Sequence, residues 1–320
     1  MQHFFSPFLF TCMLFIRFSR AAADCSIGNG RSLFEDATVV DKSGLGNFNT
    51  IQAAIDSIPQ NNNFWIKLEI KPGIYEEQVT IPKNKPCIFL QGQGRDVTTI
   101  TFDAHRKTDT SPAFTLFADN TIVNGITFKN SFKYPLGLVG FIRDKGKGSN
   151  TLTQAVAARV HGDKSAFYNC GFLGLQETLW DAEGRHYFHN CYIQRGIDFI
   201  FGSGQSSYED CVIYASAGSY SSVVSRGFIT AQGRLPRADP SSFVFRGGTI
   251  SGDLQVYLGR AYNLYSRVIF SNTTMDANVI CQGWDSWSYP GQEVNFTYLG
   301  FSEIKFFLTS SFVNTDGWLP

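Results

Sequence analysis

The chain has no excess of either charge. Its 27 basic and 27 acidic residues cancel, so a role in binding nucleic acid, which relies on a basic surface, finds no support. Long apolar runs are also missing, because the stretch at residues 4–16 (FFSPFLFTCMLFI) is too short to cross a bilayer. The small residues Ala21–Ala23 follow it, which predicts a cleaved secretory signal peptide over residues 1–23. An uncleaved anchor is the alternative.

No linker divides the rest of the chain, so we expect one domain over residues 24–320. Two common catalytic signatures are absent from it. There is no Gly-x-Ser-x-Gly elbow for a serine esterase. His161, His186 and His189 do not stand at a spacing with cysteine or acid that would complete a zinc site. We therefore expect no metal.

Cysteine is sparse. With Cys12 in the leader, six remain, and an even number in a secreted chain allows disulfides. Cys170, Cys191 and Cys211 are spaced by 21 and 20 residues, which predicts a single column in the fold. They would form a bridge there or fill the core as buried thiols. Sequons at Asn272 and Asn295 are consistent with a secreted glycoprotein.

The cysteines belong to a repeat of about 20 residues. It contains Phe167–Cys170 (FYNC), Phe188–Cys191 (FHNC) and Tyr208–Cys211 (YEDC), with degenerate copies at Phe128–Ser131 (FKNS) and Phe270–Thr273 (FSNT). This period indicates a solenoid. Because the segments are rich in Val, Ile, Phe, Thr and Tyr rather than in a leucine lattice, we predict an all-β parallel β-helix.

Two acids share the register of this repeat. Glu177 and Asp198 each stand seven residues after a repeat cysteine. Adjacent coils of a β-helix lie about 4.8 Å apart, so we expect the two carboxylates to meet at one substrate atom. Carboxylates that close cannot both ionise freely, and one keeps its proton while the other stays an anion.

Outside the repeat, residues 49–58 (NTIQAAIDSI) have helical spacing and end at Pro59, which predicts a short helix capping the first coil. Strand patterns start at Trp65. Residues 131–153 interrupt them with four glycines, and we expect this loop to be disordered or to line a site.

Five segments in order resemble the plant pectin methylesterases (pectinesterases): Gly73–Glu77 (GIYEE), Gln154–Ala157 (QAVA), Gly174–Leu179 (GLQETL), Asp198–Gly202 (DFIFG) and Leu258–Arg260 (LGR). The likeness covers roughly residues 35–298. It implies a right-handed parallel β-helix that hydrolyses methyl esters of galacturonate in pectin (methylated homogalacturonan) at the cell wall. No cofactor is expected, and the partners implied are pectin and a proteinaceous pectinesterase inhibitor, for a monomeric enzyme.

The resemblance also implies residue roles. Asp198 is the nucleophile and Glu177 the general acid and base, while Gln154 and Gln176 donate to the oxyanion. Arg260 holds the nucleophile and keeps it ionised. The residues expected to bind substrate are Gln154, Arg260, Tyr262 and Phe201.

Each residue also has a purely structural interpretation. Asp198 could cap a turn, Glu177 could be a solvated carboxylate, and Gln154 and Gln176 could form an amide ladder. Arg260 could pair with a surface acid, although the preceding Gly259 favours a close backbone approach.

Three departures from the family pattern affect function. Glu177 stands where the family usually has aspartate, Ala261-Tyr262 replaces Pro-Trp, and the sequence diverges after about Tyr298. A misplacement of about 1 Å can cost on the order of 100-fold in rate. We predict a pectin methylesterase, with a pectin-binding pseudoenzyme and a β-helical glycosidase as the alternatives.

Overall fold

The computed structural model describes residue 25 and residues 37–105, 107–133, 154–174, 177–218, 225–276, 278–296 and 307–319. The predicted leader, residues 134–153 of the predicted loop and Gln176 lie outside these residues. Within them, no helix is long and apolar enough to cross a membrane.

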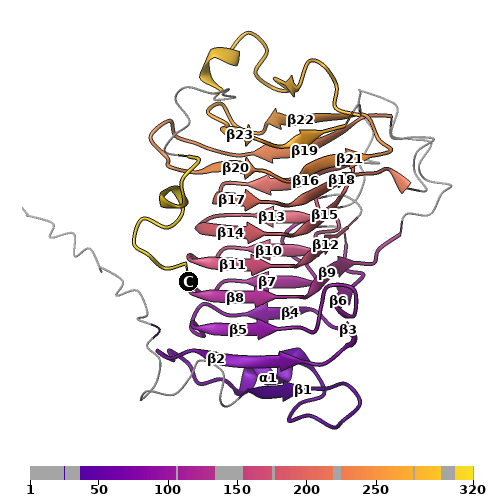
Figure 1. The fold of residues 1–320 in the computed structure, drawn as a ribbon, viewed down its shortest axis with the longest axis vertical. Coiled ribbons are helices and arrows are strands. Elements are labelled where there is room, and N and C mark those ends of the chain that lie inside the picture. Colours follow the sequence, from indigo (N-terminus) through magenta and orange to yellow (C-terminus); the bar gives the residue numbers. More distant parts are fainter. Residues whose placement is uncertain are drawn as a thin grey trace, which may run out of the picture.

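Three parallel sheets run the length of the molecule (Figure 1). Sheet 1 contains β1 Thr38–Val40, β2 Ile66–Ile70, β5 Ile88–Gln91, β8 Thr121–Asn124, β11 Ser165–Tyr168, β14 Arg185–His189, β17 Gln205–Glu209, β20 Ser242–Arg246 and β23 Val268–Ser271. Sheet 2 contains β3 Gly73–Glu76, β6 Thr98–Phe102, β9 Thr127–Asn130, β12 Gly171–Leu173, β15 Tyr192–Arg195, β18 Val212–Ala215, β21 Thr249–Gly252 and β24 Thr274–Met275. Sheet 3 contains β4 Val79–Ile81, β7 Phe114–Leu116, β10 Ala158–Val160, β13 Leu179–Asp181, β16 Ile197–Gly202, β19 Gly227–Gln232, β22 Val256–Ala261 and β25 Trp284–Asp285.

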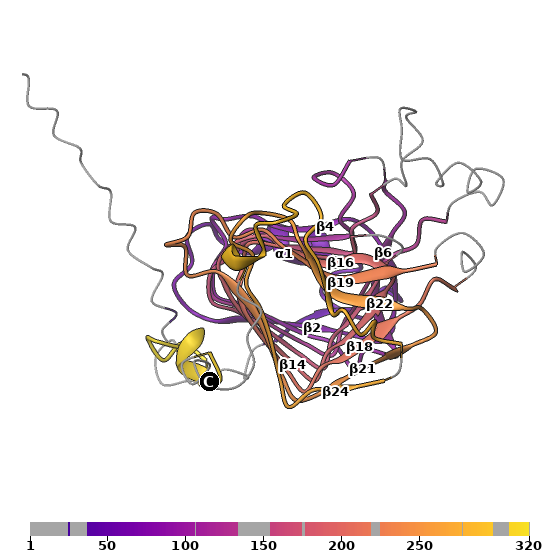
Figure 2. The same ribbon diagram turned by 90° about the horizontal axis from the view of Figure 1, so that it is seen from above.

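From β2 onward the chain visits the sheets in the order 1, 2, 3, so each strand pairs in parallel with the strand one coil later. Viewed along the long axis, the sheets form three walls (Figure 2). The side chains between the walls form one apolar core. This confirms the predicted parallel β-helix.

The aromatic residues of the repeat stack inside the core. Ring centroids are 5.0 Å apart between Phe167 and Phe188, and 4.6 Å apart between Phe188 and Tyr208. Phe245 and Phe270 extend the stack. Cys170, Cys191 and Cys211 are buried free thiols, so the column holds core filler rather than a bridge. The disulfide joins Cys25 to Cys87 instead.

A ladder of side-chain amides follows sheet 1 on the outside. Asn190 Nδ2 donates to Asn169 Oδ1 over 2.7 Å, and Asn169 Nδ2 donates to Asn124 Oδ1 over 2.9 Å. The ladder therefore continues at Asn124, and the assignment of Phe128–Ser131 as a copy of the repeat is wrong. Phe128 and Asn130 lie on β9 in sheet 2, because a strand of any of the three sheets can carry this pattern.

The predicted short helix is α1 Ile51–Ser57, with Thr50 as N-cap. Its Gln52 side chain bonds the backbone of Thr80 in β4 in both directions, at 2.7 and 3.2 Å. At the N-terminus of α1, the Glu77 carboxylate accepts hydrogen bonds from the backbone amides of Ile51 and Gln52. That α1 caps the whole solenoid stays a prediction.

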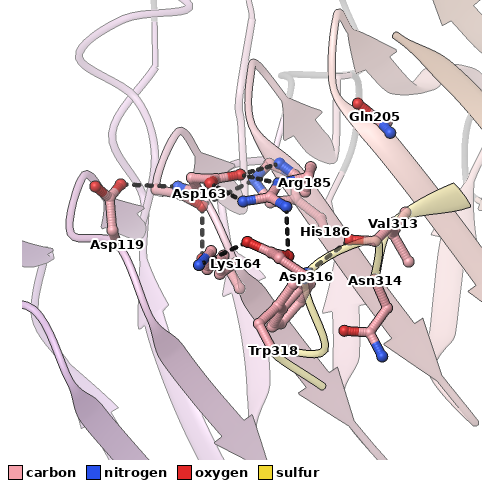
Figure 3. Close-up of polar contacts among 12 residues, drawn as sticks. Asp119, Asp163, Lys164, Arg185, His186, Gln205, Val313, Asn314, Asp316 and Trp318 are labelled. Atoms are coloured by element: carbon pink, nitrogen blue, oxygen red, sulfur yellow. Dashed lines mark hydrogen bonds and ion pairs between the residues drawn. The ribbon is translucent and has the colours of Figure 1, made fainter. Parts of the chain in front are cut away.

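The C-terminal residues 307–319 pack across the outside of sheet 1. Apart from the short 3-10 helix η5 Ser310–Phe312, these residues form no regular element. Another short 3-10 helix, η4 Glu293–Asn295, lies earlier in the chain. Phe312 and Val313 bury Val244 and Ile269 in a small second cluster. Asp316 pairs with Arg185 at 2.7 Å and Lys164 at 2.9 Å (Figure 3). The divergent end of the sequence is thus attached to the coils of the repeat.

Candidate active site

Glu177 and Asp198 occupy equivalent positions in adjacent coils, as predicted. β13 and β16 pair Leu179 with Ile200 and Trp180 with Phe201. The two acids each stand two residues before the first of these pairs, so they also lie opposite each other. The Glu177 amide donates to the Ile197 carbonyl over 3.3 Å. Both acids have left-handed backbone conformations, with φ of 58° and 45°. Such conformations are uncommon outside glycine and asparagine, and they often occur at functional sites.

Asp198 lies in an irregular part of sheet 3. The pairing of β16 with β19 shifts register between Ile197 and Ile200, and irregularities of this kind re-aim side chains next to active sites. The aspartate is only 7% exposed. Burial raises the pKa of Asp198, and the Arg260 guanidinium opposes that rise.

Arg260 holds Asp198 through two hydrogen bonds. Nε donates to Oδ1 over 2.8 Å, and Nη2 donates to Oδ2. The guanidinium lies over two aromatic rings, 3.7 Å from the Trp287 centroid and 4.5 Å from that of Phe228. A Cβ at the neighbouring Gly259 would stand 2.0 Å from Thr230 Oγ1, which confirms the expected close approach. The arginine is therefore fixed in place before any ligand binds.

Glu177 lies in a different environment from Asp198. Its Oε2 accepts a hydrogen bond of 3.0 Å from Thr108 Oγ1, from the loop between β6 and β7. The pKa of Glu177 is raised to about 7, first by burial and then by the charge of Asp198, while Thr108 and Arg260 act in the opposite direction. Near neutral pH this carboxyl can both give and take a proton.

The acids open into a cleft of about 440 Å³. Gln154, Phe201 and Tyr262 line it with Glu177 and Asp198. The backbone that follows Gln154 is held in place. The Ala155–Ala157 segment is buried, and the Val156 amide donates a hydrogen bond to Ser111 Oγ. Gln176 lies outside the described residues. A larger groove of about 900 Å³ crosses sheet 2, but the smaller cleft contains both acids, and we place the site there.

The structure adds residues to the site that the sequence did not indicate. Trp180 lines the cleft and stacks on Phe201, with ring centroids 5.6 Å apart. Trp287 contacts Tyr262, with centroids 5.7 Å apart. Neither tryptophan could be singled out in the sequence, because aromatic residues make up 15% of the chain. The fixed register to Phe201 could have identified Trp180, but no signal in the sequence points to Trp287 or Thr108.

His161 also lines the cleft. Its Nε2 accepts from Arg159 Nε over 2.7 Å, and its Nδ1 lies 3.2 Å from Glu183 Oε1. Burial lowers the pKa of His161, which favours its neutral form, while Glu183 acts in the opposite direction. Among the described residues no group of three or more His, Cys, Asp or Glu could hold a metal ion.

Comparison with known proteins identifies the family of the chain. The family model named Pectinesterase matches residues 37–305. Two relatives from Arabidopsis thaliana are Probable pectinesterase 29, 42% identical over 90% of this chain and 90% of its own length, and Probable pectinesterase 55, 44% identical over 88% and 89%. A solved pectin methylesterase from carrot matches with a TM-score of 0.77 and 26% identity, over 90% of this chain and 96% of its own. The chain belongs to the pectinesterase family, whose members are carboxylic ester hydrolases.

Proposed function

We propose that this protein hydrolyses the methyl esters of pectin, with Asp198 as nucleophile and Glu177 as general acid and base. The observation that carries the proposal is the difference between two acids at one register position. Asp198 is held by Arg260 through two charge-assisted hydrogen bonds, which favour the anion. Glu177 has a pKa of about 7, which suits proton transfer in both directions.

In the first half of the reaction, an Asp198 oxygen attacks the ester carbonyl carbon. The carbonyl oxygen gains negative charge, and we assign the stabilising hydrogen bond to the amide of Gln154, which lines the cleft. We assign the same role to Gln176 on the family resemblance. The C–O bond to the methoxyl group then breaks, and protonated Glu177 gives its proton to the leaving oxygen. Methanol leaves, and the galacturonate acyl group stays on Asp198.

In the second half, Glu177 is ionised and removes a proton from water. The hydroxide so formed attacks the acyl carbon, and the bond to Asp198 breaks. The products are a galacturonic acid carboxyl group, which then releases its proton to solvent, ionised Asp198 and protonated Glu177. One ester and one water have become one acid and one methanol. Phe201 and Tyr262 would support the sugar rings, because both line the cleft and Tyr262 is 53% exposed.

The test is methanol release from methylated pectin by the purified protein, with reducing-end release measured in parallel. Methanol without new reducing ends supports the proposal. Pectin binding without methanol would indicate the pseudoenzyme, in which the extra methylene of Glu177 has ended catalysis. New reducing ends without methanol would indicate a glycosidase.

We also propose that the protein is secreted and acts at the cell wall. The support is the leader-like sequence over residues 1–23 and the disulfide between Cys25 and Cys87, since disulfides persist in oxidising compartments. The test is the N-terminal sequence of the protein recovered from culture medium, which should begin near Asp24. A retained leader would contradict cleavage. A proteinaceous inhibitor, glycosylation at the two sequons and a monomeric state stay predictions.

A further inference from the structure

The contact between Thr108 and Glu177 joins parts of the chain 69 residues apart. Thr108 belongs to the loop between β6 and β7, whereas Glu177 lies in the turn that enters β13. Both residues line the catalytic cleft. Coil pairing does not impose this contact, because Thr108 lies in a loop outside the paired strands.

The contact depends on the length of the glutamate side chain. An aspartate at position 177 would place its carboxyl about one C–C bond, or about 1.5 Å, further back. The separation of 3.0 Å from Thr108 Oγ1 would then open beyond hydrogen-bonding distance. The hydroxyl of Thr108 therefore matches glutamate and does not match the aspartate usual in this family.

The hydrogen bond also fixes the orientation of the carboxyl. A glutamate carboxyl rotates broadly about its last torsion, and a donor on Oε2 restricts that rotation. With Oε2 engaged, Oε1 is the oxygen left to exchange a proton with the leaving group and with water. The charged groups facing Glu177 are Asp198 and Arg260, and neither of them hydrogen bonds to its carboxyl among the described residues.

We propose that Thr108 is a positioning residue that holds Oε2 of Glu177, so that a glutamate performs proton transfer at this site. The proposal rests on the proposed function, because it assigns the proton transfer to Glu177. Thr108 itself does not exchange a proton with the substrate. Its effect is on where the Glu177 carboxyl lies and on how easily it ionises.

The experiment compares Thr108→Val, which keeps the shape and loses the donor, with Thr108→Ser, which keeps the donor. Thr110→Val is the matched control, because Thr110 lies exposed in the same loop. For Thr108→Val we expect kcat to fall by about tenfold, the share of one hydrogen bond to a charged group. KM should change by less than about twofold, and Thr108→Ser should restore kcat.

The pH profile separates positioning from general damage to the fold. Since Thr108 lowers the pKa of Glu177, its removal should move the alkaline limb of the methanol-release profile to higher pH. A general acid with a raised pKa keeps its proton to higher pH. In a Glu177→Asp background the contact is already lost, so Thr108→Val should change kcat by less than about twofold. An equal loss in both backgrounds, or an unmoved alkaline limb, would overturn the proposal.

Carboxyl NMR of Glu177, assigned by comparison with Glu177→Gln, makes the test independent of activity. If the wild-type protein releases no methanol, the proposed function fails. The Thr108 contact is then decided by NMR alone. A higher pKa of Glu177 in Thr108→Val, with the wild-type value in Thr108→Ser and Thr110→Val, supports the contact. The same pKa in all four proteins would overturn it.

Discussion

Replacing Arg260 with alanine should disable the nucleophile through its protonation. The Arg260 side chain donates two hydrogen bonds to the Asp198 carboxylate, and Asp198 is only 7% exposed. Removing one partner of a buried ion pair costs about 3–5 kcal/mol if the other stays charged. Asp198 can avoid this cost by binding a proton, and each pKa unit corresponds to about 1.36 kcal/mol. The pKa of Asp198 should therefore rise in this variant.

The sign of the effect on activity follows from the role of Asp198. The attacking carboxylate must be ionised, so activity disappears as pH falls below the pKa of Asp198. A higher pKa moves this acidic limb to higher pH. In a methanol-release assay from pH 4 to 9, Arg260→Ala should lose about 100-fold or more near pH 6 and recover part of that loss toward pH 9.

Arg246→Ala is the control for this prediction. Arg246 pairs with Glu209 on sheet 1, and its side chain is 19% exposed, against 18% for Arg260. It should lower stability and leave the acidic limb in place. If Arg260→Ala keeps the wild-type acidic limb, the guanidinium does not control the ionisation of Asp198, and the reasoning is wrong.

Three further predictions concern stability and binding. The folded-state pKa of Glu177 is about 7 against an ordinary 4.5, so the free energy of unfolding should fall as pH rises through that interval. In urea unfolding at pH 8, Glu177→Gln should be more stable than wild type by at most about 3 kcal/mol. Equal stability of the wild type at pH 5 and pH 8 would contradict this. Tyr262→Ala should raise KM for pectin about fivefold with kcat within about twofold, because the role proposed for Tyr262 is to support the sugar rings and not to touch the reacting atoms. A loss confined to kcat would refute that role. Arg185→Ala removes the ion pairs of Arg185 with Asp316 and Asp163 and leaves Asp316 paired with Lys164 alone. It should lower the unfolding free energy by about 1 kcal/mol while methanol release stays unchanged. An unchanged midpoint would show that the C-terminal attachment does not depend on the Arg185 pairs.

The sequence predicted those parts of the site that depend on the coil period. Glu177 and Asp198 share a register because the same repeat spaces the cysteines and the acids, and parallel pairing turns equal spacing into proximity. The aromatic stack through Phe188 follows from the same rule. The period does not tell which of the three sheets a strand joins. Phe128–Ser131 fits the repeat pattern and still lies in sheet 2, while the amide ladder continues at Asn124.

Contacts that skip a coil, and contacts made by loops and turns, were beyond prediction from the pattern. Arg260 reaches Asp198 across 62 residues, and only the family resemblance pointed to it. Thr108 and Trp287 lie in a loop and a turn whose course the strand periodicity does not determine. The residues they contact, Glu177 and Arg260, were identified from the sequence. The course of the loop and of the turn that brings Thr108 and Trp287 to them depends on tertiary packing.

The most direct test of the central claim is methanol release from methylated pectin by wild type, Asp198→Asn and Glu177→Gln, side by side at pH 7. Wild type should release methanol. Asp198→Asn should lose at least about 1,000-fold, because the nucleophile is gone while the shape is kept. Glu177→Gln should lose about 100- to 10,000-fold, the usual share of a general acid and base. If all three proteins release methanol at one measurable rate, Asp198 and Glu177 are not the catalytic pair.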